Sequence, residues 1–106
     1  MPAYVVPNLP ERDAHAMTQL GVNPVRAAII RELARNRDGH TSGEIGREID
    51  VHYRTVWTYL KKLEEDGIVT STDPGEGRSS HWRVYQLNRK VLDTAIEQWT
   101  TYLRGE

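Results

Sequence analysis

The sequence predicts a mostly helical α+β fold in one domain, and two features of the chain support this. Apolar residues recur at helical spacing over most of the 106 residues. After Gly67 the period changes: residues 68–72 and 81–87 have strand character, and the turn-rich segment DPGEGRSS at 73–80 separates them. A two-stranded hairpin is therefore expected directly after a pair of helices.

Residues 44–69 form the centre of the predicted fold, as two short helices around a tight turn. At about 100° per residue, one face of the second helix is apolar, with Val56, Leu60 and Leu63. Ile45 and Ile49 of the first helix are four residues apart and face the same core. The opposite face of the second helix is polar, with Arg54, Thr58, Lys61 and Glu65. This is the layout of a helix-turn-helix, whose second helix can lie in the major groove of DNA.

Capping residues mark the flanking helices. A first helix is expected over residues 10–20. Asn23, Thr41 and Asn88 each precede a helical stretch and are expected to cap it. Thr41 also has the capping-box spacing to Glu44. The last helix should run from Asn88 to about residue 103, and the hairpin before it is interpreted as a wing.

Two segments are similar to a known family. EIGREIDVHYRTVWTYLKKLEEDGIV at 44–69 resembles the DNA-reading helices of bacterial and archaeal winged-helix repressors, most of all the ArsR type. LGVNPVRAAIIREL at 20–33 is similar to the segment that opens the winged domain in that family. The resemblance covers residues 10–103 and implies a winged helix-turn-helix domain there. It also implies that Tyr85 and Leu87 point inward and that the terminal helices form a dimer.

Residues 1–9 contain Pro2 and Pro7 and are expected to form an extended arm. A composition of 38% hydrophobic and 27% charged residues is typical of a soluble globular protein. Neither a secretory signal nor an apolar run of the ~20 residues that span a bilayer is found in the sequence, so we expect a cytoplasmic protein without a membrane partner.

Several functional classes are disfavoured by what the sequence lacks. The absence of cysteine excludes disulfides and thiolate metal sites. The four histidines have no metal-ligand spacing, so neither a metal nor another cofactor is expected. Phosphate-binding loops, nucleophile motifs and convincingly spaced carboxylate pairs are also missing, and we expect no enzymatic activity.

The net charge of −1 counts against DNA binding, because affinity for the duplex comes largely from Lys and Arg at the phosphates. The distribution of charge favours DNA binding more than the net charge does, since residues 51–90 contain seven basic and five acidic residues. The candidate DNA contacts lie on the second helix of the pair and in the wing loop: His52, Tyr53, Arg54, Thr55, Trp57, Thr58, Lys61, Lys62, Arg78 and Ser79.

Different roles are expected within this set. The fork of Arg54 matches the two acceptors of guanine, although a solvated Arg paired with a carboxylate is the alternative. Trp57 lies between the two faces of its helix and could equally be a boundary core residue. Lys62 suits phosphate more than base contact. Arg78 follows two glycines and suits the minor groove, or is an ordinary exposed charge in a loop.

The last helix carries more apolar surface than one small domain needs. It could simply close the core of the monomer, but we expect it also to form a dimer interface with the first helix. The candidate interface residues are Met17, Leu92, Ile96, Trp99, Tyr102 and Leu103.

These features predict a sequence-specific DNA-binding transcriptional regulator, most simply a repressor that binds a palindromic operator as a homodimer. The recognition helix would enter the major groove and the wing would lie at the minor groove. The alternative is a winged-helix protein-interaction module without DNA binding, favoured by the low net charge and by the aromatic group Tyr53, Trp57 and Tyr59.

Overall fold

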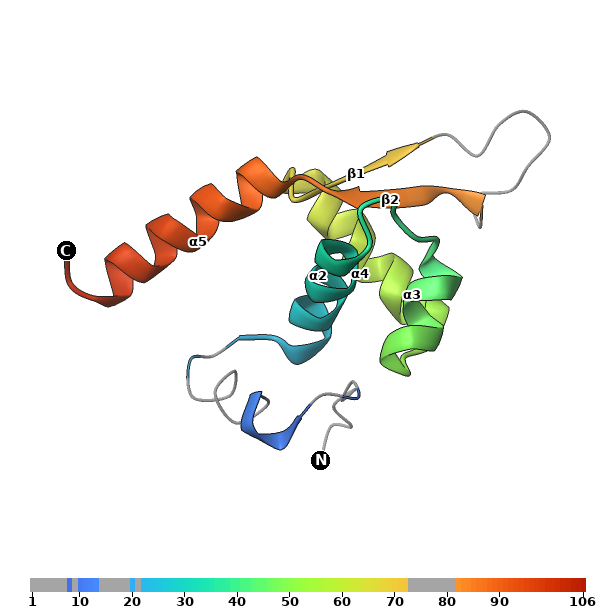
Figure 1. Ribbon diagram of the computed structural model, residues 1–106, viewed down its shortest axis with the longest axis horizontal. Helices are drawn as coiled ribbons and strands as arrows, with labels where there is room; N and C mark the ends of the chain where they lie inside the picture. The colour runs from blue at the N-terminus through green and yellow to red at the C-terminus, as the bar shows by residue number, and fades with distance from the viewer. Residues whose placement is uncertain (1–7, 9, 14–19, 21, 73–81) are drawn as a thin grey trace.

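The structure, a computed structural model, describes residues 8, 10–13, 20, 22–72 and 82–106. In chain order its elements are α2 (Pro24–Arg35), α3 (Ser42–Ile49), α4 (Tyr53–Glu65), β1 (Val69–Thr72), β2 (Val84–Leu87) and α5 (Arg89–Leu103) (Figure 1). The predicted fold class is confirmed: a mostly helical chain with an antiparallel β1–β2 hairpin directly after the helix pair α3–α4.

The three predicted caps begin their helices as expected. The side chain of Asn23 accepts hydrogen bonds from the amides of Val25 and Arg26. Thr41 and Glu44 form the complete capping box of α3. Asn88 accepts from the amide of Val91 at the start of α5. Each cap satisfies amides that would otherwise lack an acceptor, so local sequence fixes where these helices start.

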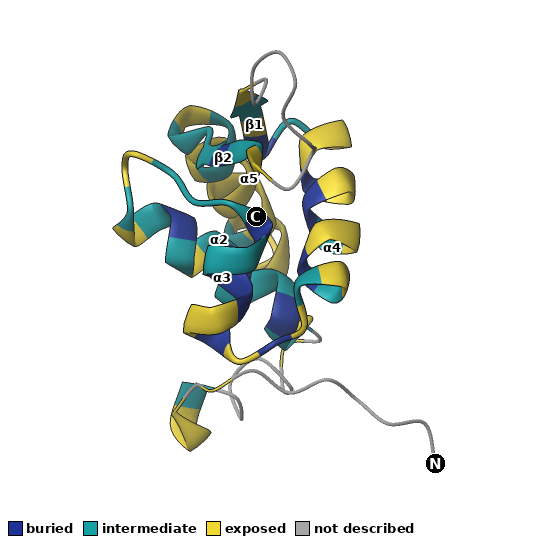
Figure 2. Cartoon of the chain, turned by 90° about the vertical axis from the view of Figure 1, so that its right-hand side faces the viewer, coloured by how far each residue is buried: buried dark blue, intermediate teal, exposed yellow. Residues whose placement is uncertain are grey.

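The core lies between α2, α3, α4 and the inner side of the hairpin. Six of its side chains have no exposed surface, namely Ile29, Leu33, Ile45, Val56, Leu60 and Leu63. Figure 2 shows buried residues where these helices face one another and exposed residues on their outer sides. Tyr85 is buried and Leu87 packs against the core, so the predicted inward direction of both is confirmed.

The hairpin is shorter than predicted at both strands. The described ladder pairs Val69 with Leu87 at one end and Thr72 with Val84 at the other. Ile68 is outside the ladder because its amide donates to the carbonyl of Leu63, which ties it to the end of α4. Trp82 and Arg83, predicted as strand residues, precede the paired segment.

One connection in the sheet was not predicted. His40, in the loop before α3, forms an isolated antiparallel bridge with Tyr85. Its amide donates to the carbonyl of Tyr85 at 3.1 Å and its carbonyl accepts from the amide of Tyr85 at 2.9 Å. The hairpin is therefore attached to the α2–α3 loop through main-chain hydrogen bonds.

Helix α5 projects away from the body of the molecule (Figure 1) and contains no buried residue. Val91, in its first turn, packs against the core, whereas Ile96, Trp99, Tyr102 and Leu103 are exposed. Most of α5 therefore does not close the core of the monomer. Within the described part of the chain, no helix combines the length and apolar character needed to cross a membrane.

The N-terminal predictions are only partly within the described residues. Residues 11–13 and Leu20 are helical and Pro10 precedes the helical residues, while residues 14–19 of the helix predicted over residues 10–20 lie outside the described residues. Of the predicted arm, residues 1–7 and 9 lie outside them as well. The amide and side-chain Nδ2 of Asn8 donate to the carbonyls of Ile49 and Glu48, both at 3.2 Å.

Two glycines of α3 provide a matched test of the turn between α3 and α4. A Cβ at Gly46 would lie 2.6 Å from the carbonyl oxygen of Val51, whereas a Cβ at Gly43 would meet only Thr41 Oγ1 at 3.9 Å. Gly46→Ala should lower the free energy of unfolding by about 1–3 kcal/mol, because the backbone must move. Gly43→Ala should raise it by up to about 1 kcal/mol through helix propensity. Urea unfolding measures both, and an equal effect of the two substitutions would contradict the close approach.

Candidate nucleic-acid interface

The turn between α3 and α4 sets the direction of α4. Asp50 has φ 58° and ψ 50°, a left-handed conformation that Asp tolerates better than most residues. The amides of Asp50 and Val51 both donate to the carbonyl of Gly46, which closes the end of α3. Val51 is buried beside the core. Helix α4 therefore starts at a fixed angle to α3, with its polar face outward.

The first residues of α4 form a stacked polar group. Nδ1 of His52 accepts from the amide of Arg54 at 3.2 Å, so His52 is the N-cap of α4. The rings of His52 and Tyr53 are stacked with centroids 4.8 Å apart. The Arg54 guanidinium lies 6.0 Å from the Tyr53 ring centre, and its Nε donates to the Tyr53 hydroxyl at 3.4 Å. This hydrogen bond raises the pKa of Arg54.

Most of the predicted DNA-contact residues of α4 lie together on its outer face and are exposed to solvent. Arg54, Trp57, Thr58, Lys61 and Lys62 are all exposed. Trp57, at 40% exposed, is not a core residue, and Nζ of Lys61 lies 4.6 Å above its ring. Such a cation–π contact holds both side chains on the surface. Thr55 and Tyr53 are half-buried beside this face.

A shallow hollow of about 490 Å³ extends this face toward α2, and Arg26 and Lys62 contribute to its lining. Oγ1 of Thr58 donates to the carbonyl of Arg54 at 3.0 Å, so its lone pairs remain available to a donor. Lys62 lies 3.9 Å from Glu65, in an exposed pair that solvent screens. The face can therefore offer cationic groups to an anionic ligand.

Two polar contacts, which the sequence did not predict, join the start of α2 to α4 and its C-cap. Nδ2 of Asn23 donates to the Tyr59 hydroxyl at 2.9 Å, and Nη2 of Arg26 donates to Asp66 Oδ2 at 2.8 Å. The second contact lowers the pKa of Asp66. The cap at Asn23 was visible in the sequence, but its partner 36 residues away was not.

The base of the wing is joined to the far end of α4. Oγ of Ser71 donates to a carboxylate oxygen of Glu64, and Nη1 of Arg83 donates to Ser71 Oγ at 3.2 Å. These contacts connect both sides of the hairpin to one helix. The predicted wing contacts Arg78 and Ser79 lie outside the described residues.

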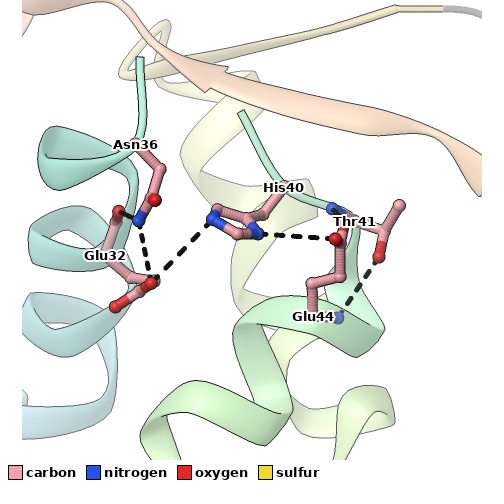
Figure 3. Close-up of polar contacts among 5 residues, drawn as sticks. All are labelled: Glu32, Asn36, His40, Thr41 and Glu44. Carbon is pink, nitrogen blue, oxygen red and sulfur yellow. Dashed lines mark hydrogen bonds and ion pairs between the residues drawn. The ribbon is translucent and has the colours of Figure 1, made fainter. Parts of the chain in front are cut away.

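The N-terminus of α3 is ordered by a polar group (Figure 3). Glu44 Oε1 accepts from the amide of Thr41 at 2.9 Å, and Thr41 Oγ1 accepts from the amide of Glu44 at 3.2 Å. The backbone hydrogen bond from Thr41 is the largest cause that lowers the pKa of Glu44, and His40 and Arg47 act in the same direction. Within the described residues, no group of three or more His, Asp or Glu side chains is arranged to hold a metal ion.

The predicted dimer residues of α5 lie on one exposed side of that helix. Ile96, Trp99 and Leu103 are 49%, 41% and 51% exposed, and Leu92 is partly buried near the helix start. Tyr102, at 79%, is the most exposed of the set. Met17 lies outside the described residues.

Comparison with known families identifies the class of domain. The family model described as "HTH domain" matches residues 25–77, which is half of the chain. The chain therefore belongs to this helix-turn-helix family. No curated protein has a significantly similar sequence.

Solved structures agree with the fold. NMB1585, a MarR family regulator from Neisseria meningitidis, is similar with a TM-score of 0.61 and 19% identity over 84% of this chain. This chain spans 65% of that protein. A mutant of MepR from S. aureus bound to an oligodeoxyribonucleotide has a TM-score of 0.55 and 14% identity, over 91% of this chain and 73% of its own. The transcriptional regulator Tm0710 from Thermotoga maritima has a TM-score of 0.54 and 22% identity, over 86% and 64%. At these identities the likeness establishes the winged helix-turn-helix fold.

The capping box of α3 should make stability sensitive to acid. Because the folded pKa of Glu44 is below its usual 4.5, this carboxylate stabilises the fold above that pH, and the contribution is lost as the pH falls through the folded value. Glu44→Gln should therefore show a smaller loss of stability than the wild type between about pH 5 and pH 3. Urea unfolding at several pH values measures this, with Asp66→Asn as the comparison for the Arg26 pair. Parallel curves for wild type and Glu44→Gln would contradict it.

Proposed function

We propose that this protein is a sequence-specific DNA-binding transcriptional regulator. The observation that carries the proposal is the outer face of α4, where Arg54, Thr58 and Lys61 are exposed on the second helix of a helix-turn-helix. A helix in this position can enter the major groove, where donors and acceptors on base edges distinguish the base pairs. The membership of the helix-turn-helix family supports the same conclusion.

Within the proposed interface, Arg54 reads a base and the residues around it contact the backbone. The Tyr53 ring and hydroxyl hold the Arg54 guanidinium near the start of α4, the end of a recognition helix that meets base edges. Lys61 and Lys62 lie further along the helix and suit phosphates, as do His52 at the helix start, Thr58 on the outer face and the half-buried Thr55. Trp57 would contact a sugar or a thymine methyl. In the wing, Arg78 would enter the minor groove and Ser79 would donate to phosphate.

A homodimer is part of the proposal. Exposed apolar patches on small proteins mark interfaces, and α5 presents Leu92, Ile96, Trp99, Tyr102 and Leu103 outside the core. Met17 on the first helix would complete the interface. A symmetric dimer would place two copies of α4 in successive major grooves about 34 Å apart on a palindromic operator.

The proposed regulator acts in the cytoplasm and represses by occupying its operator, with residues 10–103 as the working domain and residues 1–9 as an arm. The similarity of residues 44–69 to ArsR-type repressors is an interpretation of sequence, whereas the solved structures above include MarR family regulators. Both groups are winged-helix regulators, and this broader class is the one proposed for the protein. No reaction and no cofactor are part of it.

The second candidate function is a protein-interaction module. The exposed ring of Trp57 beside the half-buried Tyr53 and Tyr59 favours it, since aromatic side chains anchor protein interfaces. The cations around Trp57 favour DNA instead, because Arg54, Lys61 and Lys62 present positive charge on the same helix.

Arg54→Ala and Lys62→Ala separate base reading from phosphate contact. Arg54→Ala should weaken binding to the preferred operator by about 10- to 100-fold and relax the preference at one base pair. Lys62→Ala should weaken binding to all sequences alike and reduce its salt dependence. Fluorescence anisotropy on upstream DNA fragments, at low and near-physiological salt, measures both.

Two results would count against this assignment. An equal loss for both variants on every DNA would remove the base-reading role of Arg54. If the wild type binds no DNA even at low salt, the protein-interaction function becomes the better explanation.

Trp99→Glu tests the dimer. A charge in the centre of the exposed apolar side of α5 should yield monomers and a large loss of operator affinity, because a buried unpaired carboxylate is costly. Thr94→Glu, on the opposite side of α5, adds the same charge and should leave the dimer intact. Sedimentation velocity gives the mass of each variant. A dimeric Trp99→Glu protein would exclude this surface as the interface.

A further inference from the structure

Helix α5 leaves the body of the molecule (Figure 1), and the contacts that attach it lie near its start. The amide of its N-cap, Asn88, donates to the carbonyl of Ile68 at 2.8 Å. Val91 packs against the core, and no residue of the helix is buried. The direction of a helix of 15 residues therefore depends on a few contacts near its first turn.

Arg89, the first residue of α5, supplies a side-chain contact at this junction. Its Nη2 donates to the carbonyl of Ala34, near the end of α2, at 2.7 Å, and the pair is partly buried. Among the described residues, this is the only side-chain hydrogen bond that joins α5 to another element. The two residues are 55 positions apart in the chain, so the bond ties α5 directly to a distant helix.

The end of α2 explains why an arginine suits this position. The last carbonyls of a helix have no partner within the helix. Asn36 donates to the carbonyls of Glu32 and Leu33, through its Nδ2 at 2.7 Å and its amide at 3.3 Å. The carbonyl of Ala34 has its donor from Arg89 instead. A cation near the negative end of the α2 dipole is favoured, and a charged donor forms a stronger hydrogen bond than a neutral one.

Three attachments together define the orientation of α5. The main-chain bond from Asn88 reaches Ile68, the side chain of Val91 reaches the core, and Arg89 reaches Ala34 at the end of α2. Without the bond from Arg89, the other two would leave the helix free to turn about the line that joins them. The guanidinium is therefore the group that removes this freedom.

A small change of angle at the first turn becomes large at the far end of the helix. At 1.5 Å per residue, Leu103 lies about 21 Å from Arg89 along the axis, so a tilt of about 10° moves it by about 4 Å. The exposed apolar residues Ile96 and Trp99 lie between these two positions. In the proposed homodimer, this angle sets the separation of the two copies of α4.

We propose that Arg89 is a positioning residue that fixes the angle between α5 and the helix-turn-helix and thereby decides which half-site spacing the dimer binds. The first part concerns one chain and is independent of DNA. The second part rests on the proposed function. Arg89 is not one of the proposed DNA contacts, and it acts through the direction of α5.

Distances between two spin labels, measured by electron paramagnetic resonance, test the angle. The chain has no cysteine, so Arg47→Cys on α3 and Thr101→Cys on α5 give two exposed labelling sites. Dilution with excess unlabelled protein leaves only the distances within one chain. Arg89→Met keeps an unbranched side chain but has no donor. It should widen the distance distribution by about 3 Å, the displacement that a tilt of about 10° gives at residue 101.

Lys90→Met is the matched control. Lys90 is exposed and makes no hydrogen bond or ion pair within the described part of the chain. Its substitution removes the same charge from the same turn and should leave the distribution unchanged. Arg89→Gln, whose amide ends short of the guanidinium position, is the second variant if Arg89→Met does not fold, and the same widening is expected. Urea unfolding reports the stability of each variant, which a capping role alone would lower without changing the distances.

Operators with altered half-site spacing test the second part by anisotropy. One extra base pair turns a half-site by about 35°, so the wild type should prefer one spacing. Arg89→Met should bind that operator roughly five-fold more weakly, as expected if about one dimer in five has the correct angle. It should also lose most of the preference for spacing, whereas Lys90→Met should retain both.

The outcomes separate the two proposals. Equal distance distributions in the wild type and Arg89→Met, or equal widening in Lys90→Met, would overturn the role of Arg89. Widening in Arg89→Met, together with a wild type that binds no DNA, would support the control of the angle and overturn the DNA-binding function. Widening without any loss of spacing preference would overturn the link between the α5 angle and the operator.

Discussion

Burial of the apolar side of α4 against α3 and α2 is the constraint on which the rest of the structure depends. Val56, Leu60 and Leu63 are fully buried, and they can be so only if α4 leaves the turn at one angle. Gly46 and the left-handed Asp50 permit that angle, because the backbone of Val51 passes too close for a side chain at position 46. Every exposed group on α4 has its direction set by this packing.

Polar contacts between the elements further restrict the positions of α4 and the wing. Asn23 and Arg26 hold α4 from the side of α2, and Glu64 holds the wing through Ser71. Individually such exposed contacts contribute little to stability. Their value is geometric, since a base-reading side chain must be positioned to a fraction of an ångström by rigid neighbours. The proposed reading face therefore depends on residues that do not touch DNA.

The helix-turn-helix with its hairpin and helix α5 differ in how much of their apolar surface is buried within the monomer. The helix-turn-helix and the hairpin bury their apolar side chains against each other, and Tyr85 of the wing is part of this shared core. Helix α5 does not, since it leaves the body and exposes Ile96, Trp99 and Leu103 (Figure 1). In the proposed homodimer, a second copy of the chain would cover this surface and would also set the spacing of the two copies of α4.

The sequence by itself determined the local features: the caps at Asn23, Thr41 and Asn88, the apolar stripe of α4 and the change to strand period after Gly67. These depend on neighbours within a few residues, so spacing and residue type reveal them. Only the tertiary structure decided the start of the ladder at Val69, the exposure of Trp57 and the contact of Arg89 with Ala34. Each of these is set by residues distant in the chain, whose approach depends on how whole helices pack, and a linear pattern does not contain that information.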